Sequence, residues 1–432
     1  MTASETTLDG ELQQRILTAV DEGFDTQLAF TRELIRYPSL RGQEHTAQDF
    51  LHAAYGERGY ALDRWRVDVA ELEHHPGFSP VTIDYANAFN VVATHRPQRE
   101  RGRSLILNGH VDVVPTGPWD MWRSPPFEPR IEDDWLYGRG AGDMKAGLVA
   151  NLYALDALRR LGLQPAATVH LQSVVEEECT GNGALACLLR GYRAQAALIP
   201  EPVQETLVRA NTGVLWLRVG LRGHPVHALE AHTGSNAIEA AFHLIRALKE
   251  LEREWNARRG RHPHFADLEH PINFNVGRIE GGDWPSSVPA WCRFELRANF
   301  YPGIEPATAL REIEDHLRAA GRDHPFLANN PPEIEQTGFQ AQGYVLEAGG
   351  AAEQALDRAH RRAGQGSLKA AALPAYLDAR VFMLYDDCPA LVYGPRARAI
   401  HGFDECVSLA SLRRVTGAIA LFVADWCGLE PV

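Results

Sequence analysis

Histidine and carboxylate side chains of this chain occur where a short apolar run ends. His110 and Asp112 follow the apolar residues 105–107, with one residue between them. Because side chains alternate between the two faces of a strand, this spacing directs both groups to the same side at the strand's end. A carboxylate that receives the second ring N–H of a histidine fixes the tautomer and makes the imidazole a better metal ligand. The pair therefore suggests a metal-binding histidine supported by an aspartate.

Further acids and a second histidine follow along the chain. Asp143 lies in the glycine-rich turn at residues 138–145, where glycine lets the backbone approach a site closely. Three consecutive acids follow the strand predicted at 168–175, another follows the next strand, and a histidine occurs far downstream: Glu176, Glu177, Glu178, Glu201 and His401. Clustered carboxylates repel one another, and cations relieve that repulsion. Two histidines with several carboxylates suit divalent metal ions of borderline softness. Zinc is the first expectation, and cobalt or manganese come next.

The composition is that of an ordinary globular protein. The 432 residues allow two or three domains, and 45% hydrophobic and 23% charged residues permit a core of normal size. The net charge of −13 argues against a nucleic-acid partner and against an anionic membrane surface. The six cysteines show no Cys-x-x-Cys spacing, the N-terminus lacks a signal-peptide pattern, and no apolar run approaches the ~20 residues that span a bilayer. We therefore expect reduced cysteines and a cytoplasmic protein.

Helical and strand patterns alternate over the first half of the chain. The predicted helices lie at about 9–36, 44–58, 144–161 and 182–190, and the predicted strands at 90–94, 104–107, 168–175 and 196–199. This alternation predicts an α/β domain whose largely parallel mixed sheet is flanked by helices. In such sheets, active groups lie at the carboxyl ends of the strands.

The pattern changes after about residue 208. The predicted strands then lie at 214–221, 272–279 and 291–300, and the helices at 235–257 and 306–320. This order predicts an inserted α+β domain with an antiparallel sheet, and the chain returns to the first domain near the proline-rich residues 329–332. Helices at 346–363 and 408–426 and a strand at 391–393 complete the first domain. We therefore divide the chain into a catalytic domain at 1–208, an inserted domain at 209–330 and the second part of the catalytic domain at 331–432.

Taken together, the motifs resemble those of a known enzyme family over nearly the whole chain. They are His-x-Asp-Val-Val-Pro, Gly-Arg-Gly-Ala-x-Asp-Met-Lys, a Glu-Glu pair before a glycine-rich turn, Pro-Glu-Pro and a late His-Gly-x-Asp-Glu. Their order and spacing are similar to those of the co-catalytic metallopeptidases and deacylases that include acetylornithine deacetylase, succinyl-diaminopimelate desuccinylase and glutamate carboxypeptidase. The acetylornithine-deacetylase-like branch is the nearest match. The resemblance implies that the inserted domain is a lid that also forms a homodimer.

The resemblance also implies a site with two metal ions. In that family an aspartate bridges the ions, and each ion has one further histidine and one further carboxylate. Carried over by position, Asp143 is the bridge, and the remaining ligands are His110 with Glu201 for one ion and Glu178 with His401 for the other. Asp112 supports His110, and Glu177 is the general base. Because three glutamates run together, an alternative alignment makes Glu176 the base and Glu177 the ligand.

Other matched positions concern the substrate. His227 matches a histidine that the partner subunit's lid provides to stabilise the oxyanion, and Asn275 matches a lid residue near the substrate. The family often has an arginine that binds the substrate carboxylate, but Asn299 occupies that position here, which puts carboxylate recognition in doubt. Arg297 and Arg380 are candidates to replace it. A structural ion pair is the alternative role for each of them.

The implied reaction is metal-dependent hydrolysis of the amide bond of a small N-acyl amino acid or related amide. A water between two dications has its pKa lowered to about 7 from ~15.7, and Glu177 takes its proton and passes it to the leaving amine. An acetylornithine deacetylase, a dipeptidase, a desuccinylase and an N-carbamoyl amino-acid hydrolase would share this machinery, so the motifs do not separate them. Two other classes are a non-catalytic binding protein, which the complete catalytic set disfavours, and a metallophosphoesterase, which hydrolysis of p-nitrophenyl phosphate would reveal.

Overall fold

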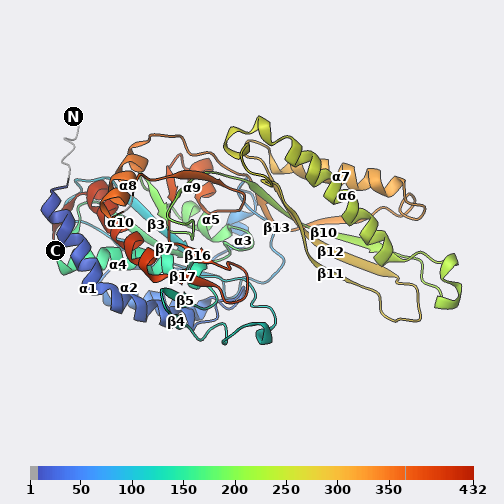
Figure 1. Ribbon diagram of the computed structural model, residues 1–432, viewed down its shortest axis with the longest axis horizontal. Coiled ribbons are helices and arrows are strands. Elements are labelled where there is room, and N and C mark those ends of the chain that lie inside the picture. Colours follow the sequence, from blue (N-terminus) through green and yellow to red (C-terminus); the bar gives the residue numbers. More distant parts are fainter. Residues whose placement is uncertain (1–7, 365) are drawn as a thin grey trace.

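The computed structural model describes residues 8–364 and 366–432 and has two parts along its longest axis (Figure 1). The larger part, which we call the body, is a sheet with helices around it. The smaller part, residues 213–341, is an elongated sheet with two helices on one side, and we call it the inserted unit. Residues 1–7 lie outside the described residues. They include the start of the N-terminal stretch that lacks a signal-peptide pattern.

A six-stranded sheet forms the centre of the body, in the order β1-β2-β7-β3-β8-β15. Its strands are β1 (Ala61–Arg66), β2 (Phe89–His95), β3 (Leu105–His110), β7 (Val169–Val174), β8 (Ala197–Ile199) and β15 (Ala390–Val392). The last four in spatial order run parallel, whereas β1, β2 and β7 are joined in antiparallel pairs. The prediction of a largely parallel mixed sheet is therefore confirmed. The parallel strands bring their carboxyl ends to one edge of the sheet, where the loops that follow them meet.

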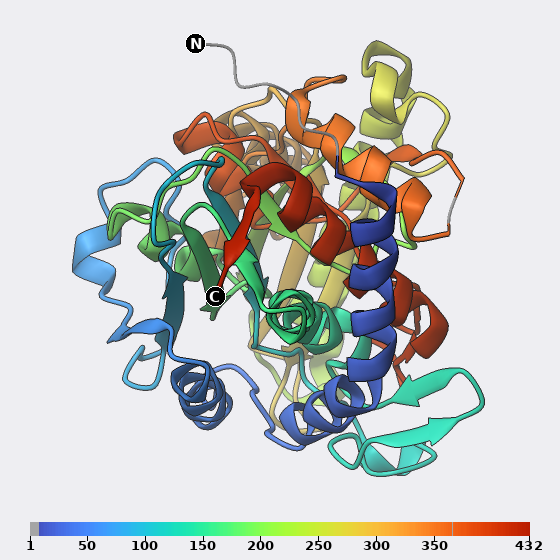
Figure 2. The ribbon, with the colours of Figure 1, turned by 90° about the vertical axis from the view of Figure 1, so that its left-hand side faces the viewer.

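Helices surround this sheet because each buries an apolar side against it. Helices α1 (Gly10–Ile35), α4 (Ala146–Arg160) and α10 (Leu409–Cys427) pack together, and Figure 2 shows them grouped on one side of the body. The remaining helices of the body are α2 (His45–Glu57), α3 (Val69–Leu72), α5 (Asn182–Leu189), α8 (Ala351–Arg362) and α9 (Ala379–Tyr385). Almost every residue of α4 is buried. The first turn of this helix approaches the ends of β3 and β8, since Leu148 lies beside Gly109 and Gly147 lies beside the Pro200 carbonyl.

Smaller sheets hold the loops of the body. One has the order β16-β17-β5-β4, and its strands are Ala397–Arg398, Cys406–Ser408, Trp135–Tyr137 and Arg130–Glu132. The pairs β9 (Leu207–Asn211) with β14 (Ala370–Leu373) and β6 (Leu163–Pro165) with β18 (Leu429–Pro431) are two-stranded. The first of these sheets joins the glycine-rich turn to the segment around residue 401, so that residues far apart in sequence are neighbours.

The inserted unit is an antiparallel sheet covered by two helices on one face. Its strands have the order β11-β12-β10-β13, with bounds Phe274–Gly281, Trp291–Phe300, Gly213–Arg222 and Glu333–Ala341. Helices α6 (Ala237–Ala257) and α7 (Pro306–Arg322) pack their apolar sides on alternate strand residues such as Leu217 and Leu296. The prediction of an inserted α+β unit with an antiparallel sheet is confirmed.

Strand β13 lies beyond residue 330, where the sequence analysis ends the inserted domain. It pairs with β10 and also contacts the body, since the Gln340 amide donates to the Ser79 hydroxyl at 3.0 Å. The strand is not evident in the sequence because charged and polar residues interrupt its apolar alternation, and because the prolines before it resemble a domain boundary. We propose that the inserted unit ends after residue 341. Among the helices of the described residues, none has the length and apolar character needed to cross a lipid bilayer.

Candidate metal centre

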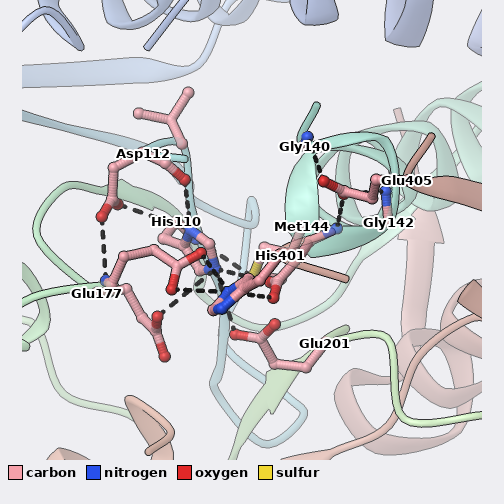
Figure 3. A network of polar contacts seen from close by, with 12 residues as sticks. His110, Asp112, Gly140, Gly142, Met144, Glu177, Glu201, His401 and Glu405 are labelled. Atoms are coloured by element: carbon pink, nitrogen blue, oxygen red, sulfur yellow. Dashed lines mark hydrogen bonds and ion pairs between the residues drawn. The ribbon is translucent and has the colours of Figure 1, made fainter. Parts of the chain in front are cut away.

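Side chains from five separate segments meet at the edge of the central sheet where the parallel strands end (Figure 3). One ends β3, and the others precede α4, follow β7, follow β8 and precede β17. In that order they are His110, Asp143, Glu177 with Glu178, Glu201 and His401. The structure thus brings together all five residues predicted as metal ligands. Their roles as ligands remain a prediction.

The geometry of Asp143 divides the cluster into two sets. One set consists of His110, Asp143 and Glu201, and the other consists of Asp143, Glu178 and His401, with the potential ligand atoms of each set within 4.8 Å of one another. Oδ1 of Asp143 lies 3.2 Å from Nε2 of His110, whereas Oδ2 lies 3.5 Å from Nε2 of His401. The two oxygens of one carboxylate therefore face two different histidines, which is the arrangement of a bridging ligand.

The electrostatics of the cluster fit bound cations. Burial and the neighbouring carboxylates raise the pKa of Glu201 well above its usual range, and its Oε1 atom is buried without a hydrogen-bond partner among the described residues. Burial would lower the pKa of His401, but the carboxylates of Glu178 and Asp143 outweigh it and raise that pKa to about 11. So many acids close together favour positive charge between them, and imidazole with carboxylate oxygen is a donor set suited to zinc.

The structure distinguishes the three consecutive glutamates. The Glu176 carboxylate is saturated by donors from its own surroundings, at 2.5 and 2.7 Å from Arg41, 2.6 Å from the Tyr85 hydroxyl and 3.0 Å from the Thr180 hydroxyl. Glu177 instead lines the cavity, and its Oε2 lies 3.8 Å from Nε2 of His110. This geometry favours Glu177 as the base and Glu178 as the ligand over the alternative alignment.

Asp112 supports His110 differently from the prediction. The Nδ1 atom of His110 lies 2.9 Å from the backbone carbonyl oxygen of Asp112 and 3.6 Å from its carboxylate, so the carbonyl accepts the ring N–H. The carboxylate accepts the amide N–H of Glu178 at 3.1 Å instead. Strand β3 ends at His110, so the alternation that would have aligned the two side chains does not continue to Asp112. In the structure the hydrogen bond of the ring is thus made by the carbonyl of Asp112 and not by its carboxylate, and the tautomer that this requires still leaves Nε2 facing the cluster.

Glu405 holds the turn that carries Asp143, and sequence reasoning recorded it only as a motif member. Its Oε1 accepts the amide N–H groups of Gly142 and Asp143 at 2.8 and 2.9 Å. Its Oε2 accepts the Gly140 amide at 3.0 Å (Figure 3). The same oxygen accepts the Arg139 guanidinium at 2.6 Å. The available signal was an acid four residues after a histidine of the predicted metal site. The contact itself spans more than 260 residues, which spacing along the chain does not reveal.

A cavity of about 460 Å³ opens onto the cluster. The inserted unit and the body provide aromatic side chains to its wall, namely Trp216, Phe339 and Tyr376. The rings of Trp216 and Phe339 meet edge to face with centroids 5.3 Å apart, and those of Phe339 and Tyr376 are 4.3 Å apart. The volume suits a small molecule, and the sequence analysis did not anticipate this wall.

The three predicted substrate-binding residues lie in different places. Arg297 on β12 lines the cavity. Asn275 lies opposite Arg297 on β11 and is exposed outside the cavity lining. Arg380 is buried away from the cavity, where it donates to the Gly77 carbonyl at 3.3 Å and to the Tyr385 hydroxyl at 3.0 Å. These contacts indicate a structural role for Arg380, although its partners are a carbonyl and a hydroxyl and not the acid of the ion pair that the sequence analysis named as the alternative.

His227 belongs neither to the cluster nor to the lining of the cavity in its own chain. It is exposed on the inserted unit, where its Nδ1 accepts the Leu229 amide at 3.0 Å and caps a short 3-10 helix, Ala228–Thr233. With Nδ1 as acceptor, the neutral ring carries its proton on Nε2, which points a hydrogen-bond donor outward. The structure therefore does not bring His227 to the site of its own chain, and its role stays a prediction.

Comparisons with known proteins agree with this geometry. Residues 106–425 match the model of peptidase family M20/M25/M40. The N-formyl-4-amino-5-aminomethyl-2-methylpyrimidine deformylase of Halalkalibacterium halodurans is 28% identical over 440 residues, covering 96% of this chain and 98% of that protein. A succinyl-diaminopimelate desuccinylase of Methylorubrum extorquens is 28% identical over 404 residues, covering 90% and 96%. Human carnosine dipeptidase 1 has the same fold, with a TM-score of 0.76 at 15% identity over 96% of this chain and 99% of that chain.

Proposed function

We propose that this chain, which belongs to peptidase family M20/M25/M40, removes a small acyl group from an amine by hydrolysing the amide bond between them. The chain is a hydrolase of amide bonds, as are its curated relatives. The single observation that carries the finer proposal is the position of Asp143, whose two carboxylate oxygens face the histidines of two ligand sets. The acetylornithine-deacetylase type of reaction, on an N-acyl amino acid, is the first to test.

The residues proposed to hold the metals are the two sets already described. His110, Asp143 and Glu201 would hold one divalent ion, and Glu178 and His401 would hold the second with Asp143 as the bridge. Zinc is the expected metal, with cobalt and manganese as alternatives. Bound ions of this kind polarise an amide carbonyl and lower the pKa of a water to about neutrality.

Glu177 is proposed to move the proton. Its carboxylate lines the cavity beside His110 and, unlike that of Glu176, accepts no hydrogen bond from the described residues. It can therefore accept a proton from water that attacks the amide carbon and donate it to the departing nitrogen. The breaking C–N bond then leaves a neutral amine and a carboxylic acid. Asp112 orients the turn that carries Glu177 and Glu178 through its bond to the Glu178 amide.

His227 is proposed to act on the active site of a partner subunit in a homodimer formed through the inserted unit. Its exposed Nε2–H is the type of donor that stabilises an oxyanion. Apolar side chains near this loop are also exposed, at 83% for Leu229 and 69% for Trp284, and a second copy of the chain would bury them. These observations support the dimer that the resemblance implies.

The test is amine release from a panel of amides. Metal-free protein is reloaded with zinc, cobalt or manganese and offered N-acetyl, N-formyl, N-succinyl and N-carbamoyl amines and dipeptides. We expect release that requires metal and is confined to one acyl class. Deformylation and desuccinylation deserve inclusion because they are the reactions named for the relatives. Silence across the panel, together with hydrolysis of p-nitrophenyl phosphate, would overturn the amidase proposal.

A further inference from the structure

Two of the proposed metal ligands, Glu201 and His401, come from segments that run beside each other in the body. Strands β8 and β15 pair in parallel, and just beyond them the Tyr393 amide donates to the Ile199 carbonyl at 3.0 Å. Gly394 follows, and a Cβ atom on this glycine would lie 2.1 Å from the carbonyl oxygen of Glu201. The chain then continues through β16 to His401. A displacement of this segment would therefore reach both ligands.

The loop after β8 is fastened to the same segment by its backbone. Gln204 and Glu205 both have left-handed φ angles, +59° and +62°, which residues other than glycine rarely adopt. Such a conformation persists where contacts from the surroundings hold it. Here the Glu205 amide donates to the Gly394 carbonyl at 2.8 Å, and the side-chain amide of Gln204 donates to the Ala397 carbonyl at 2.9 Å. The loop of one ligand and the segment that leads to the other thus meet at these two residues.

The Glu205 side chain adds a buried charge to this junction. Its carboxylate, only 2% exposed, lies between two arginines. Oε1 accepts a hydrogen bond of 2.6 Å from Arg414 on α10, and Oε2 accepts one of 3.3 Å from Arg396. Arg396 directly precedes β16 and stands five residues before His401. Because a buried carboxylate is stable only with such partners, the ion pairs hold the loop, the His401 segment and α10 together.

Glu205 acts on the ligands only through these contacts. It belongs neither to the metal cluster nor to the lining of the cavity. It lies four residues after Glu201 in a tight turn, in which the Val203 amide donates to the Glu201 carbonyl at 2.7 Å. The bridging Asp143 is held elsewhere, by Glu405. The two buried acids thus divide these ligand segments between them.

We propose that Glu205 is a positioning residue that fixes Glu201 of one ligand set relative to His401 of the other. The inference rests on the proposed function, because it requires that both sets bind a metal ion. Partners that orient metal ligands change metal affinity by about 10- to 100-fold when they are replaced. The loss of Glu205 releases the loop and the His401 segment from each other, so both ions should bind more weakly. The loss of Arg396 leaves Glu205 paired with Arg414, so only the ion at His401 should be affected.

Zinc affinity and stoichiometry, measured by competition with a chromogenic chelator, test this role at a temperature where every variant is folded. Glu205→Gln keeps the size of the side chain and removes its charge, and it should bind both zinc ions about 10- to 100-fold more weakly than the wild type. Arg396→Met should lower the affinity for one ion by about 10-fold and leave the other unchanged. A His401→Ala background leaves only the position of His110 and Glu201. There Arg396→Met should have no further effect on zinc affinity, whereas Glu205→Gln should still lower it.

Two control variants remove comparable ion pairs outside the segment that leads to His401. Glu353→Gln breaks the pair of Glu353 with Arg209, which joins α8 to β9. Arg414→Met removes the other arginine of Glu205, which comes from α10. Both should lower the melting temperature and leave both zinc affinities unchanged. A merely structural role of Glu205 predicts this same result for Glu205→Gln.

Both zinc ions bound by Glu205→Gln as tightly as by the wild type would overturn the positioning role. If Glu205→Gln does not fold, Arg396→Met decides, because Arg396 is a half-exposed side chain. Two unchanged affinities in that variant would equally overturn the role of Glu205. A wild type that binds fewer than two zinc ions would instead contradict the proposed metal centre and, with it, the proposed function.

Discussion

Replacing Glu405 by glutamine should weaken metal binding even though Glu405 is not itself proposed as a ligand. Its carboxylate accepts four hydrogen bonds, three from the amides of Gly140, Gly142 and Asp143 and one from Arg139. These bonds determine where the turn presents the Asp143 side chain. If that position matters, the change should reduce the affinity of both metal positions, since Asp143 belongs to both ligand sets.

The expected magnitude follows from those contacts. The amide oxygen of glutamine can keep one pair of bonds, whereas its NH₂ group faces the other two donors. Hydrogen bonds to charged groups contribute about 1.5–3 kcal/mol each, so the loss of two is about 3–6 kcal/mol. Breaking a buried ion pair such as Glu405 with Arg139 costs about 3–5 kcal/mol. We expect the free energy of unfolding to fall by about 3–5 kcal/mol and metal affinity to fall about 10- to 100-fold, as when an outer partner of a ligand is lost.

Two measurements separate the effects on folding and on the metal site. Urea denaturation of the metal-free protein gives the free energy of unfolding, and competition with a chromogenic chelator gives zinc affinity and stoichiometry. Glu430→Gln is the matched control: Glu430 is buried and accepts the Gln98 amide at 2.6 Å, but it is not part of the cluster. It should lose stability with unchanged zinc affinity. Two zinc ions bound by Glu405→Gln as tightly as by the wild type would refute the positioning role.

Three further predictions test single residues. Glu177→Gln should keep both metals and lose at least ~100-fold in kcat, whereas Glu176→Gln should mainly lower the melting temperature; the reverse pattern would restore the alternative alignment. His227→Ala should lose about 100-fold or more in kcat at unchanged metal content, and mixing it with Glu177→Ala should return about a quarter of wild-type activity if the histidine acts across a dimer. Burial lowers the pKa of His170 from 6.5 to about 4, so the neutral form is favoured in the folded state and its stabilisation, complete above pH 6.5, is lost as the pH falls toward 4. Relative to His170→Gln, the wild type should lose up to about 3 kcal/mol of unfolding free energy over that range, and a pH-independent difference would contradict this.

Much of the architecture was predictable because it depends on local patterns. Apolar residues at helical spacing located α1, α4, α6 and α10 to within a few residues, and short apolar runs located β3, β7 and β12. Strand β13 was missed because charged and polar residues interrupt its apolar alternation, so that only its pairing with β10 reveals it as a strand. The long helices and central strands therefore follow from residues within a few positions of one another, whereas edge strands depend on distant partners.

The types of residue at the site, and hence its metal chemistry, were already determined by the sequence, because histidine and carboxylate side chains have their ligand properties wherever the fold places them. Only the tertiary structure decided which atoms meet. It surrounds the Glu176 carboxylate with hydrogen-bond donors and leaves Glu177 in the cavity. It directs the ring N–H of His110 to a backbone carbonyl, and it buries Arg380 away from the cavity. It also brings Glu405 to the Asp143 turn and leaves Arg297 without an acid. These outcomes depend on packing between segments separated by tens to hundreds of residues. The free energy of such tertiary contacts outweighs the local preferences that can be read from neighbouring residues.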